Sequence, residues 1–168
     1  MQQSGSGWVV YGDDVEAVAF EWGVAKFLSE PAVTGAERFS FGMVVLAPGK
    51  GHERHNHPGA EEIIYVLSGE GQQMVDDQPP ITVRAGASIY VPADVYHSTL
   101  NTSWEPMRLL VLYSPAGPER LLRDIPGSRV IPAGRVPAKG QAHLDKSDQR
   151  RRKSYDKRAT TRRCCIAH

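Results

Sequence analysis

"GKGHERHNHPGAEEIIYVLSGEG" (residues 49–71) is the stretch that decides the fold of this chain. Three of the chain's six histidines, His52, His55 and His57, stand here, and two adjacent glutamates follow them. Such a cluster is typical of two different things: a solvated polar loop, or a set of metal ligands presented by a β-scaffold.

The alternation of side chains along a strand sorts this cluster into two faces. Residues two apart point to the same face, so His55 and His57 can aim at one point. The turn at Pro58-Gly59 can return the chain to the sheet and bring Glu62 back to that point. By the same parity, Glu61 faces the other way, which makes Glu62 the ligand candidate of the pair.

Two imidazoles and a carboxylate are good ligands for a borderline divalent metal. Three such ligands with open coordination positions are the arrangement of non-haem iron oxygenases. A lone His-x-His is nevertheless more often part of a histidine-rich surface loop, so the rest of the sequence has to decide. Beyond Glu62, the parity predicts that Ile64 and Val66 face inward and that Tyr65 and Leu67 face outward.

The remaining sequence favours short strands separated by turns. Extended segments are predicted at 15–20, 25–28, 38–49, 61–77 (two strands around a turn), 81–86, 87–92, 95–101 and 107–115. Only residues 117–125 favour a helix, and it is short. Regularly spaced strands with turns between them predict an all-β sandwich or barrel.

Length and charge divide the chain into a folded part and a tail. The 168 residues suit one domain, and the only cysteines, Cys164 and Cys165, are neighbours that cannot cross-link distant strands. Residues 138–168 hold ten of the 20 Lys and Arg residues but three of the 19 acidic ones, with few large apolar side chains. We expect a flexible N-terminus over 1–14, a barrel domain over 15–136 and a disordered basic tail over 137–168.

The same sequence suggests a compartment and limits the partners. No segment approaches the length of a membrane span, and "MQQSGSGWVV" lacks the basic and apolar regions of a signal peptide. We therefore expect a soluble, cytoplasmic protein without membrane contact. Binding of nucleic acid is expected only as a role of the basic tail, for which simple solvation is the plainer interpretation.

Two spaced motifs resemble those of the cupin superfamily over roughly residues 38–115. The first, complete at every defined position, is Gly49-x5-His55-x-His57-x4-Glu62-x6-Gly69. The second is Gly86-x5-Pro92-x-Asp94-x2-His97-x3-Asn101. The one departure is Asp94, where the family usually has Gly. Both residue types tolerate a positive φ, so the turn is expected to survive the change.

The resemblance implies a fold and a ligand set. Cupins are small jelly-roll β-barrels, often dimers, whose metal is held by residues of both motifs. Carried over to this chain, the ligands are His55, His57, Glu62 and His97. The resemblance thus implies one divalent metal ion, with Fe(II) favoured and Mn, Zn, Ni or Co open, together with a small-molecule substrate and a homodimer.

Three classes of function fit this sequence. A non-haem Fe(II) dioxygenase acting on a small chelating organic substrate is the first hypothesis, because the motifs contain no Lys and Arg cluster suited to a sugar phosphate. A non-redox isomerase, lyase or decarboxylase is the second, and a cupin that binds a small molecule without catalysis is the third.

No catalytic residue is identified. The pocket is expected to be lined by Phe39, Phe41, Met43, Ile64 and Tyr113.

Overall fold

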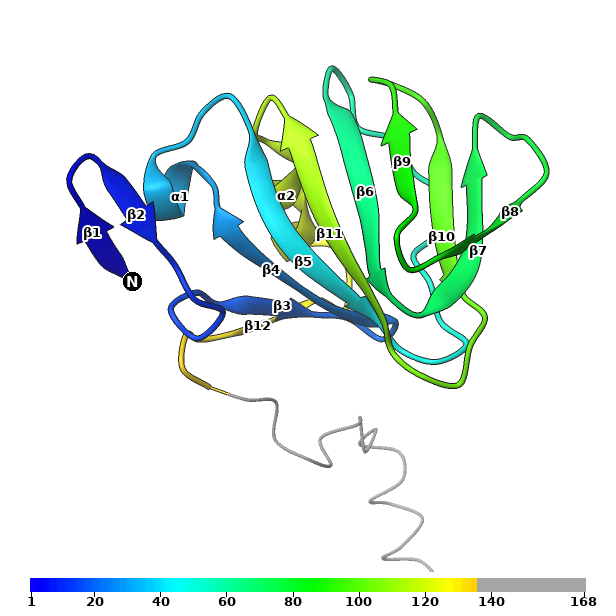
Figure 1. Ribbon diagram of the computed structural model, residues 1–168, viewed down its shortest axis with the longest axis horizontal. Helices are drawn as coiled ribbons and strands as arrows, with labels where there is room; N and C mark the ends of the chain where they lie inside the picture. Colours follow the sequence, from blue (N-terminus) through cyan, green and yellow to red (C-terminus); the bar gives the residue numbers. More distant parts are fainter. Residues whose placement is uncertain (136–168) are drawn as a thin grey trace, which may run out of the picture. The chain divides into compact units, whose positions relative to one another are not determined.

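The structure, a computed structural model, describes residues 1–135, and short antiparallel strands dominate it (Figure 1). The strands are β1 (Gln2–Ser4), β2 (Gly7–Val9), β3 (Ala17–Ala19), β4 (Gly23–Ser29), β5 (Ser40–Leu46), β6 (Glu61–Ser68), β7 (Glu70–Val75), β8 (Ile81–Arg84), β9 (Ser88–Val91), β10 (His97–Asn101), β11 (Met107–Ser114) and β12 (Arg129–Ile131). The helical elements are α1 (Pro31–Thr34), α2 (Pro118–Leu121) and the 3-10 turn η1 (Leu122–Asp124). The predicted basic tail, 137–168, lies outside the described residues.

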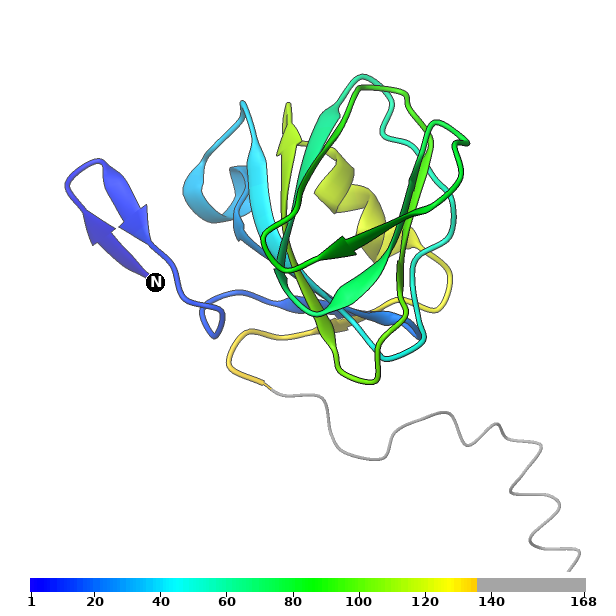
Figure 2. The same cartoon turned by 45° about the vertical axis from the view of Figure 1, so that its right-hand side comes forward.

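Two sheets enclose the interior of a barrel. Seven strands form the large sheet in the order β12-β3-β4-β5-β11-β6-β9, and three form the small sheet in the order β10-β7-β8. Figure 2 shows the small sheet closing over the part of the large sheet that contains β6 and β9. The predicted all-β jelly-roll barrel with a short helix after it is confirmed. Within residues 1–135, no helix is long and apolar enough to span a membrane.

The core lies between the two sheets and is built by alternate residues of β6 and β11. Ile64 and Val66 of β6 are buried there, as are Leu109, Val111 and Tyr113 of β11. The predicted inward parity of β6 is therefore confirmed. Of the five predicted pocket residues, Ile64 and Tyr113 face this interior.

The predicted orientation of strand β5 is wrong. Phe39, Phe41 and Met43 lie on the outer face of the large sheet, and the residues of β5 that alternate with them are buried. Gly42 faces inward, where a Cβ would lie 2.8 Å from the ring of Phe27 on neighbouring β4. The interior has no room for a larger side chain beside that ring, and Phe41 and Met43, on either side of Gly42, lie on the outer face.

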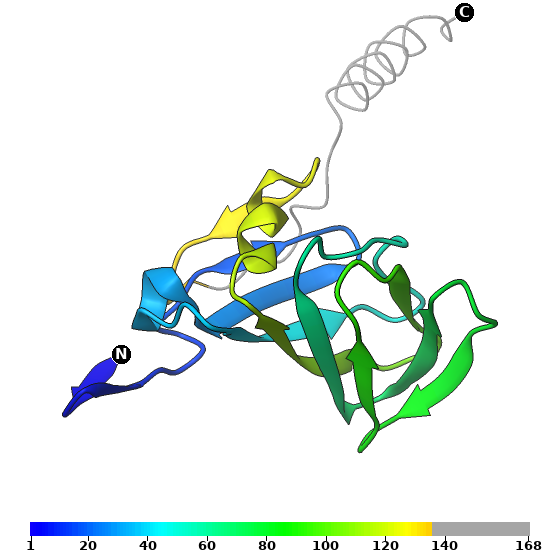
Figure 3. The same cartoon turned by 90° about the horizontal axis from the view of Figure 1, so that it is seen from above.

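The helix predicted over 117–125 is present as α2 followed by η1. Figure 3 shows these turns packed over one side of the β3–β5 region of the large sheet. A buried hydrogen bond connects the helix to the sheet, because Ser40 Oγ of β5 donates to Glu119 Oε2 of α2 at 2.8 Å. The sheet face that holds the core is thus covered by the small sheet and by α2.

Residues 2–9 lie in the segment expected to be flexible and form the hairpin β1–β2. The hairpin projects beyond the barrel in Figures 1 and 3, and all its residues are exposed. It makes no sheet with the barrel strands.

Asn101, the last residue of β10, is a buried anchor for two loops. Its Nδ2 donates to the carbonyls of Leu46 at 3.1 Å and Glu105 at 2.8 Å, and its Oδ1 accepts from the Ser103 N–H at 2.9 Å. We expect Asn101→Ala to lower the free energy of unfolding by about 2–4 kcal/mol in urea titrations, because buried backbone groups lose their partners. The exposed neighbour Thr102 provides the control, since Thr102→Ala should change stability by less than about 0.5 kcal/mol.

Candidate metal centre

Four side chains from three parts of the chain meet inside the barrel. His55 and His57 lie in the loop between β5 and β6, Glu62 is the second residue of β6, and His97 opens β10. The His55 N–H donates to the His97 carbonyl at 3.0 Å, and the His97 N–H donates back to the His55 carbonyl at 2.8 Å. This isolated bridge brings the two rings to a centroid distance of 4.3 Å.

The donor atoms are close enough to share one ion. One ring nitrogen from each of His55, His57 and His97 lies within 4.8 Å of the other two. Glu62 Oε2 lies 3.3 Å from His57 Nε2 and 2.8 Å from His97 Nε2. Two donors bound to one ion at about 2.1 Å and at right angles are about 3.0 Å apart. The separations around Glu62 therefore fit donors that share a divalent ion.

Hydrogen bonding leaves the same atoms unpaired. His57 Nε2, Glu62 Oε2 and His97 Nε2 are buried and have no hydrogen-bond partner among residues 1–135. Buried polar atoms in folded proteins nearly always have a hydrogen-bond partner, so three unpaired atoms at one point need an explanation. A cation bound among them accounts for all three.

The outer nitrogens of two rings are tied to the backbone. His55 Nδ1 lies 2.9 Å from the Glu53 carbonyl, and His97 Nδ1 lies 3.2 Å from the Val95 carbonyl. A carbonyl oxygen can only accept, so each Nδ1 donates to the backbone and Nε2 is the ring nitrogen that remains for a metal. Backbone partners of this kind orient the histidine ligands of many metal sites.

Asp94 joins the two motifs through the turn before β10. Its φ is 66°, which confirms the prediction that Asp fits the positive-φ position. The carboxylate also adds a contact that Gly lacks, because Asp94 Oδ1 accepts from the Gly59 N–H at 3.1 Å. The Asp94 N–H donates to the His57 carbonyl at 3.2 Å, so this turn supports the histidine loop directly.

Comparison with known proteins agrees with this geometry. A family model described as a cupin domain matches residues 42–113. The chain is 33% identical over 110 residues to Protein SchB of Streptomyces halstedii, an alignment that covers 66% of this chain and 79% of SchB. The chain belongs to the cupin superfamily. The resemblance inferred from the two motifs is confirmed.

Two further proteins are similar to this chain, one in sequence and one in fold. Polyketide synthase CurC of Streptomyces cyaneus is 30% identical over 118 residues, which cover 70% of this chain and 75% of CurC. The solved structure of KdgF from a Halomonas species superposes with a TM-score of 0.59 at 16% identity, over 68% of this chain and 99% of that chain. At that identity the likeness shows the fold alone.

The charges at the centre of this cupin suit a cation. Burial by itself raises the pKa of the Glu62 carboxyl, but His57 and His97 beside it outweigh that effect and hold the pKa at about 2. Burial lowers the pKa of His55 to about 3, with His52 and His97 nearby adding to the effect. Near neutral pH, the centre therefore presents an ionised carboxylate and a neutral His55 ring.

His52 is a fourth histidine of the cluster that the motif spacing does not assign. Its ring packs edge-on against His55 at a centroid distance of 4.7 Å and against Trp22 at 5.9 Å. Burial lowers its pKa to about 4. Trp22 lies far from the motifs in sequence, so no local pattern could have shown that His52 turns towards the other histidines.

A row of polar side chains extends from the centre across the large sheet. Tyr113 of β11 pairs with Glu62 on one side and with Ser40 on the other. The Tyr113 ring lies 4.7 Å from the His57 ring, and burial, together with the charges of Glu62 and Glu119, raises the tyrosine's pKa well above its usual value. Tyr113 therefore keeps its proton at neutral pH.

Glu119, at the far end of this row, is a buried carboxylate that the sequence did not single out. Its Oε2 accepts from Ser40 Oγ at 2.8 Å and from the Gly117 N–H at 2.7 Å. Its Oε1 has no hydrogen-bond partner among residues 1–135, and Arg120 Nε is 3.8 Å away. A second carboxylate with a spare acceptor thus lies near Tyr113. Only the packing of α2 on β5 reveals it.

The histidine pKa values predict how metal-free protein responds to acid. In the unfolded chain His52 and His55 titrate near 6.5, but in the fold they stay neutral down to about 4 and about 3. Below about pH 6.5, and until the folded-state pKa values are reached, the unfolded state binds more protons than the folded state. The free energy of unfolding must therefore fall as the pH falls. We expect the melting temperature of metal-free protein to drop steadily from about pH 7 to about pH 5.

The variant His52→Gln tests the cause. It should make the pH dependence shallower, because one of the two titrating groups is gone. A melting temperature that stays constant over this range in the wild type would contradict the pKa assignments.

Proposed function

We propose that this cupin is a metal-dependent enzyme that holds one divalent ion with His55, His57, Glu62 and His97 and acts on a small chelating organic substrate. The convergence of three unpaired buried atoms, from His57, Glu62 and His97, carries the proposal. The donor set fits a borderline divalent metal, because it combines imidazole nitrogens with one carboxylate oxygen.

We favour Fe(II) as the ion and dioxygenation as the reaction. Two histidines lie within 3.3 Å of one carboxylate oxygen, namely His57 and His97 around Glu62, and His55 is an additional ligand. Two histidines and a carboxylate with open positions form the donor set of non-haem Fe(II) oxygenases. When bound, Fe(II) supplies dioxygen activation next to a chelated substrate, whereas Mn, Zn, Ni or Co supplies Lewis acidity.

The chain's own residues contribute orientation, charge and exclusion of water. Backbone carbonyls hold the rings of His55 and His97 with Nε2 directed inward. Tyr113 keeps its proton and can donate it in a hydrogen bond to Glu62 or to a substrate oxygen. Ile64 of β6 and Val111 of β11, which alternate with Glu62 and Tyr113, add buried apolar surface beside the centre, which suits a partly apolar substrate.

A non-redox reaction is the second candidate, and one observation favours it. CurC, 30% identical to this chain, bears the name polyketide synthase. Chains of alternating carbonyl groups chelate metals through neighbouring oxygens, and a Lewis acid promotes their enolisation and aldol-type ring closure without any oxidant. On this alternative, the same four ligands serve a non-redox isomerase, lyase or decarboxylase, and the similarity to CurC favours a dicarbonyl compound as its substrate.

Removal of one ligand tests the metal site. We expect wild-type protein, purified without chelators and supplemented with Fe(II), to hold about one ion per chain by elemental analysis. His97→Ala should weaken metal binding by at least about 100-fold, because it removes a donor and breaks the ring pair with His55.

The control for this experiment is His52, a half-buried histidine of the same cluster. His52→Asn alters a ring that packs against His55 but contributes no proposed ligand atom, so the ion content should stay close to wild type. Equal ion content in wild type, His97→Ala and His52→Asn would rule out the assigned centre.

Oxygen dependence separates the two reaction classes. We expect anaerobically prepared Fe(II) protein to consume oxygen in step with substrate loss over a panel of diketones, phenols and small chelating acids. Substrate loss that proceeds equally without oxygen would favour the non-redox alternative instead. Tight binding without turnover of any panel member, in either atmosphere and with any of the five metals, would identify a binding protein and contradict both enzyme proposals.

A further inference from the structure

A cleft of about 670 Å³ lies over β3 and β4, on the side of the large sheet that holds the core. Buried Val18, Ala25 and Phe27 form its floor, and we call it the β3–β4 cleft. Sites for small molecules have volumes of roughly 300–1,000 Å³, so this cleft is large enough to hold one. None of the four proposed metal ligands is among the described residues that line it.

Small apolar side chains keep this cleft open. Ala32 and Val33 of α1 line one part of it, and Pro132 and Ala133, which follow β12, line another. Apolar walls of this kind are typical of sites that hold the hydrocarbon part of a small molecule, with a few polar groups to orient it.

Two aromatic rings separate the cleft from the metal centre. The ring of Phe27 lies 5.9 Å from the ring of Tyr113, which in turn lies 4.7 Å from the ring of His57. Phe27 and Tyr113 are both buried. The cleft and the metal centre therefore lie on the same side of the sheet but have different linings.

The polar part of the cleft is an ion network around Arg123 of η1. Arg123 Nε donates to Glu16 Oε1 at 2.7 Å, and Arg123 Nη2 donates to Glu30 Oε1 at 3.1 Å. Arg123 Nη1 donates to the Glu119 carbonyl at 3.4 Å. All three nitrogens of the guanidinium thus have partners within the fold, so this arginine has little capacity left for an anion in the cleft.

The network contains more negative than positive charge. One guanidinium serves the carboxylates of both Glu16 and Glu30, so one negative charge remains without a counterpart. The two other charged side chains of the lining do not change this balance. Asp14 pairs with the N-terminal amine of Met1, and Arg120 has the Glu119 carboxylate 3.8 Å from its Nε.

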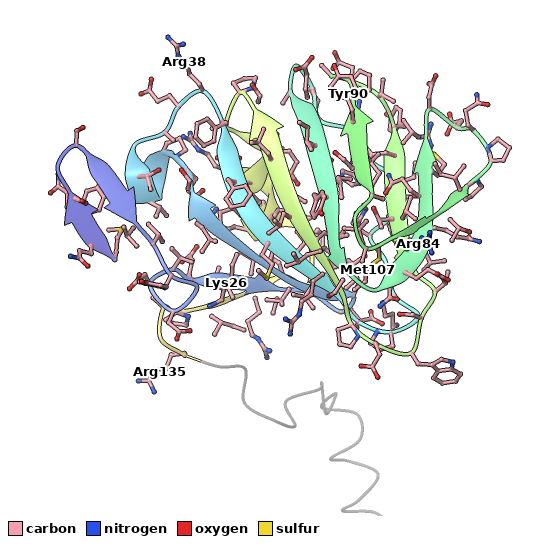
Figure 4. The ribbon with its side chains drawn as sticks, viewed as in Figure 1. Lys26, Arg38, Arg84, Tyr90, Met107 and Arg135 are labelled. Atoms are coloured by element: carbon pink, nitrogen blue, oxygen red, sulfur yellow. The ribbon has the colours of Figure 1, made fainter. Side chains whose placement is uncertain are left out.

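The nearest lysine of the sheet does not supply the missing charge. Lys26, labelled in Figure 4, lies between Ala25 and Phe27 on β4, so its side chain points to the opposite side of the sheet. Its Nζ donates to the Gly12 carbonyl. Among the described residues that line the cleft, the cations are Arg120 and Arg123, and each already faces a carboxylate.

Glu30 is the carboxylate that keeps an unused acceptor. It lines the cleft although its exposed fraction is 4%. Within residues 1–135, its side chain accepts a hydrogen bond from Arg123 at Oε1 and none at Oε2. A buried carboxylate oxygen without a donor costs free energy. A cationic donor that enters the cleft removes this cost.

We propose that the β3–β4 cleft binds a small organic amine, with its ammonium group against Glu30 and its hydrocarbon part on the apolar floor. An ammonium group has three donors and no acceptor, so it suits carboxylate oxygens that have no partner. Hydrogen bonds between two charged groups are also stronger than those between neutral groups. The proposal is independent of the metal and of the reaction.

Three probes with the same hydrocarbon part test the charge preference. They are phenylbutylamine, phenylbutanol and phenylbutanoate, and they are titrated into full-length protein at neutral pH in a calorimeter. We expect the amine to bind with a dissociation constant below about 1 mM, at least about 10-fold more tightly than the alcohol or the carboxylate. Added Zn(II) should change the affinity for the amine by less than about threefold, because the cleft and the metal centre are separate.

The variant Glu30→Gln tests the assigned carboxylate. Glutamine keeps an acceptor for Arg123 but removes the charge, so the affinity for phenylbutylamine should fall by at least about 10-fold. Glu37→Gln is the matched control, because it removes an exposed carboxylate that does not line the cleft. It should change the affinity by less than about threefold.

A second pair of variants tests the apolar walls and applies even if Glu30→Gln fails to fold. Ala32→Trp adds a large ring to an exposed residue of the lining, so it should weaken amine binding by at least about 10-fold. Leu121→Trp adds a ring to a residue of α2 that is 60% exposed and does not line the cleft. It should leave the affinity within about threefold of wild type.

Several results would overturn the proposal. Equal affinities for the three probes, or no binding of the amine at about 5 mM, would exclude an amine site. Amine binding that requires Zn(II) would place the probe at the metal centre. Binding that survives both Glu30→Gln and Ala32→Trp, or that the control variants weaken equally, would place it elsewhere on the protein.

Discussion

Two backbone hydrogen bonds between His55 and His97 are the constraint on which the rest of the centre depends. They join a loop of the first motif to the first residue of β10, so two imidazoles distant in sequence become neighbours. The large sheet then contributes Glu62 from β6, and its carboxylate meets both His57 and His97. The centre therefore exists only where the two sheets close on each other.

That arrangement leaves the barrel interior with an unusual polar content. Glu62, His97 and Glu119 are almost completely buried, and unpaired atoms remain on each of them. Burial of this kind costs free energy unless the groups are paired, so a fold that keeps them has a use for them. In the proposed function a bound cation is the partner of Glu62 and His97, and Glu119 has a spare oxygen close to Tyr113.

The two sides of the large sheet have opposite characters. The inner side combines apolar packing with the polar row through Tyr113, whereas the outer side carries exposed Ile63, Tyr65 and Tyr90. The two sides of one sheet thus differ in what they offer, with a candidate metal centre on the inner side and exposed apolar side chains on the outer.

The sequence by itself determined the strand pattern, the two cupin motifs and the inward parity of β6, where Glu62 marked one face as the side of the ligands. It could not orient β5, because alternation gives relative parity within a strand and β5 contains no ligand to mark a face. The tertiary structure puts Gly42 on the inward side, where a Cβ would lie 2.8 Å from the Phe27 ring of β4, together with the buried Val44 and Leu46. The placement of His52 and Glu119 likewise followed from Trp22 and Ser40, which lie far away in the chain and become neighbours only after the sheets pack.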